Sequence, residues 1–85
     1  MFDNYFRGVF ADFLGASFMD GPVSGWQIDM IKESISRYNE SMIDHSQLTF
    51  QEKEDRKKQM KQSLEEYIHG VKDLLEREGR LKKDV

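Results

Sequence analysis

The sequence predicts an all-α protein, in which an antiparallel helical hairpin (24–44 and 49–78) packs against an N-terminal aromatic-rich helix (3–18). Two N-capping motifs mark the starts of the hairpin helices. Apolar residues recur at spacings of three and four, which is the helical repeat. The only proline falls between the first two segments. With 85 residues, the chain is long enough for one small helical domain, 1–85.

The first segment, 1–19, holds the aromatic-rich helix. Its bulky residues cover nearly half of the helical circumference; they are Phe2, Tyr5, Phe6, Val9, Phe10, Phe13 and Leu14. Small residues, including Gly8 and Gly15, line the opposite side. Glycine inside a helix costs about 1 kcal/mol, so these two indicate close approach by another element. The helix is expected either to be sandwiched within the monomer or, as we favour, to meet a second copy or a partner.

The second segment follows the turn 20–23, which contains the proline. Ser24 and Gln27 have the spacing of a capping box, so a helix over 24–44 is expected. Apolar residues occupy the two hydrophobic-staple positions that flank this box, namely Val23 and Ile28. The apolar stripe of the helix is typical of coiled-coil-like packing and consists of Ile28, Ile31, Ile35, Tyr38 and Met42.

A short loop, 45–48, separates the two helices of the hairpin. Thr49 and Glu52 repeat the capping-box spacing at the start of the third segment. The stripe of the helix over 49–78 consists of Met60, Leu64, Tyr67, Val71 and Leu74, widened by Ile68 and Leu75. Gly79 follows the last periodic turn, where a helix end is expected.

The hairpin is not expected to be packed evenly along its length. At the loop end, Lys53 and Lys57 occupy stripe positions near Tyr38 and Met42, so this tip should be thin, wet and charged. The core should lie toward the other end, between the isoleucines of the second segment and the apolar stripe of the third. Beyond the core, residues 79–85 are expected to form a frayed tail.

The composition excludes several kinds of chemistry. The chain has no cysteine and two histidines, which excludes disulfides, thiolate catalysis and cysteine-ligated zinc. Glu66 and His69 have the spacing of half a di-iron site, but the sequence has no second pair of this kind. No phosphate-binding loop and no nucleophile-base arrangement is evident. We therefore expect no enzymatic activity, no metal site and no cofactor.

The bulky face of the first segment and the tryptophan of the second are candidates for a protein interface. The candidate residues are Phe2, Tyr5, Phe6, Gly8, Phe10, Phe13, Gly15 and Trp26. Aromatic residues are enriched at interface hot spots, although a small core needs the same residues. We expect a non-enzymatic protein–protein interaction module, a small regulator, adaptor or inhibitor that acts by steric binding to a protein partner, and we expect a homo-oligomer.

Nucleic-acid or nucleotide binding is the first alternative. It would use a basic cluster of the third segment, formed by Arg56, Lys57, Lys58 and Lys61. The cluster follows Glu52, Glu54 and Asp55, which are placed to pair with it along the helix. The whole chain has 13 basic and 16 acidic residues, a formal net charge of −3, so nucleic acid is not favoured as a partner.

Membrane-surface association is the second alternative, and it would use residues 1–19. Helices of this kind usually carry several basic residues, whereas this segment carries a single arginine. No apolar run is long enough to span a bilayer, and no signal-peptide pattern is found. A cytoplasmic location is therefore expected.

Overall fold

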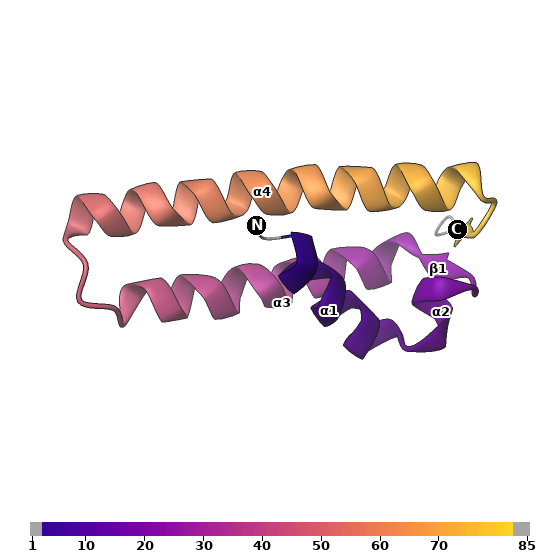
Figure 1. The fold of residues 1–85 in the computed structure, drawn as a ribbon, viewed down its shortest axis with the longest axis horizontal. Coiled ribbons are helices and arrows are strands. Elements are labelled where there is room, and N and C mark those ends of the chain that lie inside the picture. Colours follow the sequence, from indigo (N-terminus) through magenta and orange to yellow (C-terminus); the bar gives the residue numbers. More distant parts are fainter. Residues whose placement is uncertain (1–2, 83–85) are drawn as a thin grey trace.

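Two long antiparallel helices form the body of the protein, and a shorter helix crosses one side of them (Figure 1). The structure is a computed structural model, and it describes residues 3–82. The helices are α1 (Asp3–Leu14), α2 (Ala16–Met19), α3 (Gly25–Asp44) and α4 (Phe50–Arg77). Two short strands, β1 (Val23–Ser24) and β2 (Leu81–Lys82), pair in parallel with Val23 opposite Leu81. The predicted all-α fold and its hairpin are confirmed.

Both hairpin helices begin at the capping motifs that predicted them. The Ser24 backbone N–H donates to Gln27 Oε1 at 3.0 Å, and the Thr49 N–H donates to Glu52 Oε1 at 3.2 Å. The second box is closed in both directions, because the Glu52 N–H donates to Thr49 Oγ1 at 3.2 Å. Such boxes satisfy backbone donors at helix starts that have no acceptor within the helix.

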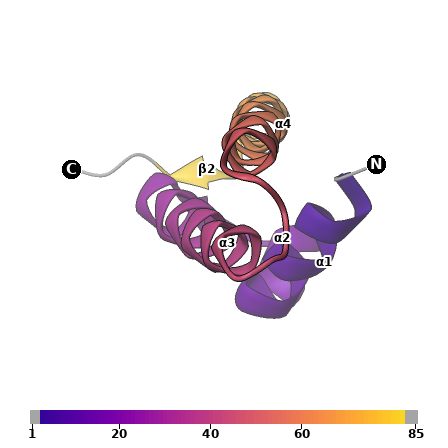
Figure 2. The same ribbon diagram turned by 90° about the vertical axis from the view of Figure 1, so that its left-hand side faces the viewer.

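The core extends from the middle of the hairpin to the end opposite its loop. Seen along the hairpin, α3, α4 and α1 surround it as a triangle (Figure 2). Phe6 and Phe10 of α1 are completely buried, and both rings lie against Tyr67 of α4 at centroid distances of 5.5 and 5.6 Å. The other buried residues are Val23, Ile28, Ile31, Ile35, Met60, Leu64, Ile68 and Leu75.

The buried face of α4 is rotated relative to the predicted stripe. Leu74, expected in the seam, is 54% exposed, whereas Ile68 and Leu75 are buried. The side of α4 that carries Leu74 faces α2, and an open hollow lined by Leu74, Phe18 and Met19 remains between the two helices. The four-residue helix α2 is too short to fill this space, so Leu74 stays in contact with water.

The N-terminal segment forms two helices instead of the single helix predicted over 3–18. α1 ends at Leu14, and Gly15 adopts φ = 59°, a left-handed conformation that breaks the helix. Residues with a Cβ rarely adopt this φ, so glycine suits the position for conformational reasons. After the break the chain turns, and α2 lies beside the second half of α4.

The residues after α4 are ordered as far as the structure describes them, in contrast to the predicted frayed tail. Gly79 has φ = 69°, and the Arg80 N–H donates to the Leu75 carbonyl oxygen at 2.8 Å. This arrangement is a Schellman motif, which ends the helix and turns the chain back. β2 can then pair with β1. Residues 83–85 of the predicted tail lie outside the described residues.

The Arg80 guanidinium joins the end of α4 to α2, and we call this contact the Arg80 clasp. Nη2 donates to the carbonyl oxygens of Ser17 and Phe18 at 2.8 Å each, and Nε donates to that of Gly21 at 2.9 Å. Carbonyl groups at the end of a helix carry partial negative charge, so a guanidinium is a suitable partner for them. The clasp fixes the turn that follows α1 against the hairpin.

A pair of leucine substitutions on α4 tests the position of its buried face. Leu64→Ala is expected to lower the free energy of unfolding by about 2–5 kcal/mol, because it leaves a cavity in the core. Leu74→Ala removes the same atoms from an exposed site and is expected to cost only about 0.5 kcal/mol. Urea denaturation followed by circular dichroism measures both values. Equal losses would contradict the rotation of α4 described above.

Arg80→Lys tests the clasp, because lysine keeps the charge and loses the planar fork of donors. We expect a local loss of about 1.5–3 kcal/mol, seen as faster hydrogen exchange of the Gly21 and Val23 amides. The amides of the hairpin helices should retain their protection. Arg77→Lys, on an exposed side chain in the last turn of α4, is the matched control. Identical exchange in the two variants would argue against a structural role for the clasp.

Candidate functional site

An exposed apolar surface runs along two helices, and we call it the α1–α3 surface. It is formed by Tyr5, Phe13, Trp26, Met30, Ser34 and Tyr38. Phe13, Trp26 and Met30 are 63, 51 and 60% exposed. Large apolar side chains that gather on one face of a small protein are typical of an interaction surface, whereas scattered ones are ordinary.

The spacing of residues along α3 creates this surface. Trp26, Met30, Ser34 and Tyr38 follow one another at intervals of four, so they form a single ridge on the helix. The isoleucines of α3 point elsewhere and are buried in the core. α1 lies beside the ridge and contributes two aromatic residues, so the surface combines side chains from two helices.

Two hollows lie between the ridge and α1. The first, of about 190 Å³, is bordered by Trp26 and Met30, and the second, of about 380 Å³, by Tyr5 and Tyr38. Phe13 belongs to the border of both. Among the residues that the structure describes, no Asp, Glu, Lys, Arg or His lines either hollow. The surface therefore offers apolar contacts and no acid–base pair.

The structure separates the predicted interface residues into different environments. Phe6 and Phe10 are packed against α4 and are completely buried, which removes them from the candidate interface. Tyr5, Phe13 and Trp26 are exposed and belong to the α1–α3 surface. The aromatic face of α1 is thus divided, because the middle of the face points into the core and its edges do not.

The glycines of the first segment are not explained by close packing within the described part of the chain. A methyl group placed at Gly8 or at Gly15 would meet no atom within 4 Å. The expected sandwich around this helix is therefore absent from residues 3–82. Gly15 is accounted for by its backbone conformation, and nothing in the structure explains Gly8. Phe2 lies outside the described residues.

Three residues of the α1–α3 surface are missing from the sequence-based interface. The sequence pattern does not identify Met30 and Ser34, and it places Tyr38 in the hairpin seam together with Met42. Both seam assignments are wrong, since Tyr38 and Met42 are 60 and 58% exposed. No described helix covers this part of α3, because α1 begins beside Tyr38 and runs the other way. The interval of four that repeats from Trp26 onward is the sequence signal that could identify these residues as one ridge.

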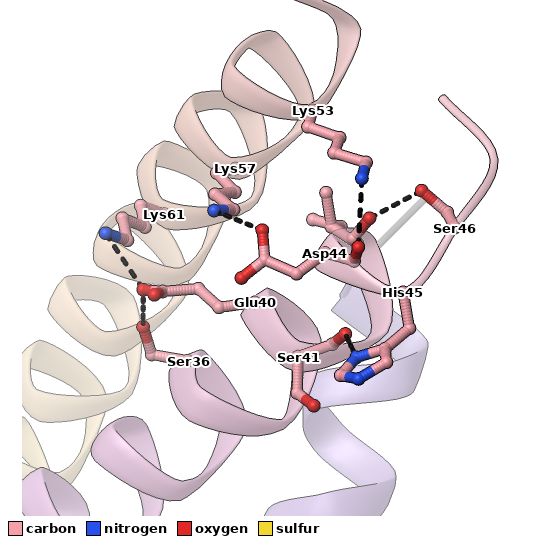
Figure 3. A network of polar contacts seen from close by, with 10 residues as sticks. Ser36, Glu40, Ser41, Asp44, His45, Ser46, Lys53, Lys57 and Lys61 are labelled. Atoms are coloured by element: carbon pink, nitrogen blue, oxygen red, sulfur yellow. Dashed lines mark hydrogen bonds and ion pairs between the residues drawn. The ribbon is translucent and has the colours of Figure 1, made fainter. Parts of the chain in front are cut away.

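The loop end of the hairpin is held by polar contacts, as predicted for a thin and charged tip. Figure 3 shows lysines of α4 reaching across to α3. Lys57 Nζ lies 2.5 Å from Asp44 Oδ1, and Lys61 Nζ lies 2.9 Å from Glu40 Oε1. Lys53 Nζ donates to the carbonyl oxygen of Asp44 at 2.9 Å. These contacts occupy the place that apolar side chains take further along the seam.

The ion pairs of the tip shift the acidities of their members. The hydrogen bond from Lys57 lowers the pKa of Asp44, and the hydrogen bond from Lys61 lowers the pKa of Glu40. The contact with Asp44 in turn raises the pKa of Lys57. A carboxylate with a lowered pKa stabilises the fold above its ordinary pKa, and this stabilisation disappears as the pH falls through the lowered value. The stabilisation from Lys57 is present below the ordinary lysine pKa and is lost as the pH rises through the raised value.

The four members of the basic cluster do not share one face. Lys57 and Lys61 point toward α3 and pair with its acids, in place of the expected pairing along α4. Arg56 and Lys58 are exposed, and residues two apart on a helix point about 200° away from each other. A continuous phosphate-binding surface would need all four charges free and on the same side.

A third hollow, of about 570 Å³, lies between α4 and the α1–α2 segment. Its apolar lining includes Phe18, Met19 and Leu74. Arg7 and Glu66 also line it, so this hollow has charged residues where the α1–α3 surface has none. The apolar pattern of the sequence does not predict this hollow, because it places Leu74 in the seam.

Substitutions within the basic cluster test the tip. Lys57→Met should raise the pKa of the Asp44 carboxyl toward the ordinary aspartate value of about 3.9, because the hydrogen bond is removed. Lys58→Met removes the same charge from an exposed neighbour and should leave this pKa unchanged. A pH titration of the side-chain carboxyl resonances by NMR gives both values. An unshifted Asp44 in the parent chain would contradict the ion pair.

Within residues 3–82, no three acidic or histidine side chains gather in a group that could hold a metal ion. None of the helices described is long and apolar enough to cross a membrane. Comparison of the chain with protein-family models, with curated proteins and with solved structures found no match. Any proposal for function therefore depends on the surfaces described above.

Proposed function

We propose that this chain is a non-enzymatic protein-binding module and that the α1–α3 surface is its docking site. One observation carries the proposal: Phe13, Trp26 and Met30 stand exposed and adjacent along two helices, on a chain of which 34% is charged. Aromatic residues and methionine are enriched in the buried centres of protein interfaces, from which charged residues are depleted.

The chemistry of the surface favours protein over other ligands. The residues that line its two hollows carry no cationic group to bind a phosphate and no base to activate a nucleophile. Trp26 and Tyr38 combine a large apolar area with a polar atom, which suits them to interface positions. A protein surface with apolar side chains of its own is the partner that this lining fits.

The surface is also preorganised. Phe6 and Phe10 anchor α1 to α4, and the Arg80 clasp holds the turn that follows α1. A docking surface on fixed helices loses little conformational entropy on binding. The action that follows from such a surface is steric: the bound chain covers, bridges or positions its partner, as a small regulator, adaptor or inhibitor does.

Site-specific photo-crosslinking in the native cells tests this proposal. Phe13→p-benzoylphenylalanine places the reactive group between the two hollows, and we expect it to form covalent adducts with protein on illumination. Lys58→p-benzoylphenylalanine, at an exposed site on α4, is the matched control and should form none. Adding Met30→Glu to the Phe13 variant should abolish the adducts. No adduct at position 13, or equal adducts at both positions, would overturn the docking site.

A further inference from the structure

We propose that the occupant of the α1–α3 surface is a second copy of this chain, related to the first by a two-fold axis that passes beside Phe13 and Ser34. The inference rests on the proposed function, since it names the partner of the same surface. Its four supports are the area of the surface, its shape, the order of residues along α3, and the charges beside them.

The area is close to the lower limit for a specific dimer. At about 200 Å² for each fully exposed aromatic side chain, Tyr5, Phe13, Trp26 and Tyr38 together expose on the order of 400 Å². Two copies therefore supply about 800 Å² from aromatic residues alone, and Met30 adds to this on each side. A specific interface needs about 1,000 Å² in total, so the surface comes close to this limit.

The shape is self-complementary. An isologous interface requires that the same surface carry both a projection and the cavity that receives it. Phe13 projects at 63% exposure and lies between two hollows of about 190 and 380 Å³. A two-fold axis beside Phe13 places the ring of each copy over a hollow of the other. Ser34, which also borders both hollows, is small enough to let the two α3 helices approach at the axis.

The order of residues along α3 favours an antiparallel pairing. The ridge continues past Tyr38 to Met42 at the same interval of four. When two such ridges cross about Ser34 in opposite directions, Met30 of each copy faces Tyr38 of the other, whereas Trp26 and Met42 lie two turns from the crossing and outside this contact. Each of the two symmetric pairs joins a methionine to an aromatic residue, which is a favourable contact of sulfur with a ring. Ridges at intervals of four pack together at a crossing angle of about 50°.

The charges beside the ridge favour the same direction. Asp29, Glu33 and Arg37 follow one another on α3, also at intervals of four, and Arg37 bonds to Glu33 at 3.1 Å. In the antiparallel pairing, Arg37 of each copy comes near the acidic Glu33 of the other, whereas Asp29 is already paired with Lys72 of its own chain at 3.0 Å. A parallel two-fold pairing would put the flank that carries Arg37 on opposite sides of the interface in the two copies, so Arg37 would not meet Glu33 of the other copy.

The mass of the purified full-length chain in solution is the first test. Sedimentation or light scattering from low micromolar to millimolar concentration should show a dimer of twice 10.1 kDa. Met30→Glu places two carboxylates in the interface and should raise the dissociation constant of the dimer about 30-fold or more. Met19→Glu, at a residue of nearly equal exposure next to the third hollow, should leave it unchanged. Both sites are exposed, so the helical circular dichroism of each variant should match that of the parent.

Cysteine crosslinking tests the axis and the direction, and the chain has no cysteine of its own to interfere. Ser34→Cys should form a disulfide-linked dimer under mild oxidation, whereas Ser41→Cys, an exposed serine elsewhere on α3, should not. Met30→Cys mixed with Tyr38→Cys should give mixed dimers, and neither variant alone should crosslink efficiently. Efficient crosslinking of each variant with itself would overturn the antiparallel arrangement.

The outcomes separate this inference from the proposed function. A chain that stays monomeric at millimolar concentration, while position 13 still forms adducts with a different protein in cells, overturns the second copy and leaves the docking site intact. A dimer that Met30→Glu does not weaken, and that Ser34→Cys does not crosslink, places self-association elsewhere and also overturns the inference. Absence of adducts from position 13 overturns both proposals.

Discussion

The packing of α1 against the hairpin is the constraint on which the rest of the structure depends. Two helices alone would leave one side of their apolar seam in water, and Phe6 and Phe10 close that side by packing against Tyr67. Burial of a phenylalanine side chain contributes roughly 1.5–3 kcal/mol, which is a large share of the stability of a domain this small. Once these two rings are fixed, the helical repeat decides which residues of α1 face outward.

The two ends of the hairpin are stabilised by different kinds of interaction. The loop end has ion pairs between α4 lysines and α3 carboxylates, all in contact with water. The opposite end has a buried core, a Schellman motif and the Arg80 clasp. The α1–α3 surface lies along the part of α3 that α1 flanks, and within residues 3–82 no helix covers the outer side of α3 there. The surface is exposed because α1 packs against one flank of α3 and leaves the ridge beside it uncovered.

The elements with local signals could be predicted from the sequence, and those that depend on distant contacts could not. Ser24 and Thr49 marked helix starts because a cap involves only the next three residues. The break at Gly15 was missed because glycine is compatible with either a helix or a turn, and the choice depends on where α2 packs. Arg80 was placed in a frayed tail because its acceptors lie about 60 residues earlier. For the candidate site, Tyr5, Phe13 and Trp26 were identified by their type, whereas Met30 and Tyr38 needed the position of α1.

The pairing of β1 with β2 has a consequence for the order in which the molecule assembles. The short loop between α3 and α4 brings together helices that are neighbours in sequence, so the hairpin closes with little loss of chain entropy. Val23 and Leu81 lie before α3 and after α4, so their pairing joins residues that are separated by the whole hairpin. Contacts of such long range form late in folding. The packing of Phe6 and Phe10 against Tyr67 is of similarly long range, so we expect α1 to take its final place after the hairpin has closed. We therefore expect the α1–α3 surface to be completed after the hairpin and to be lost first when the fold opens.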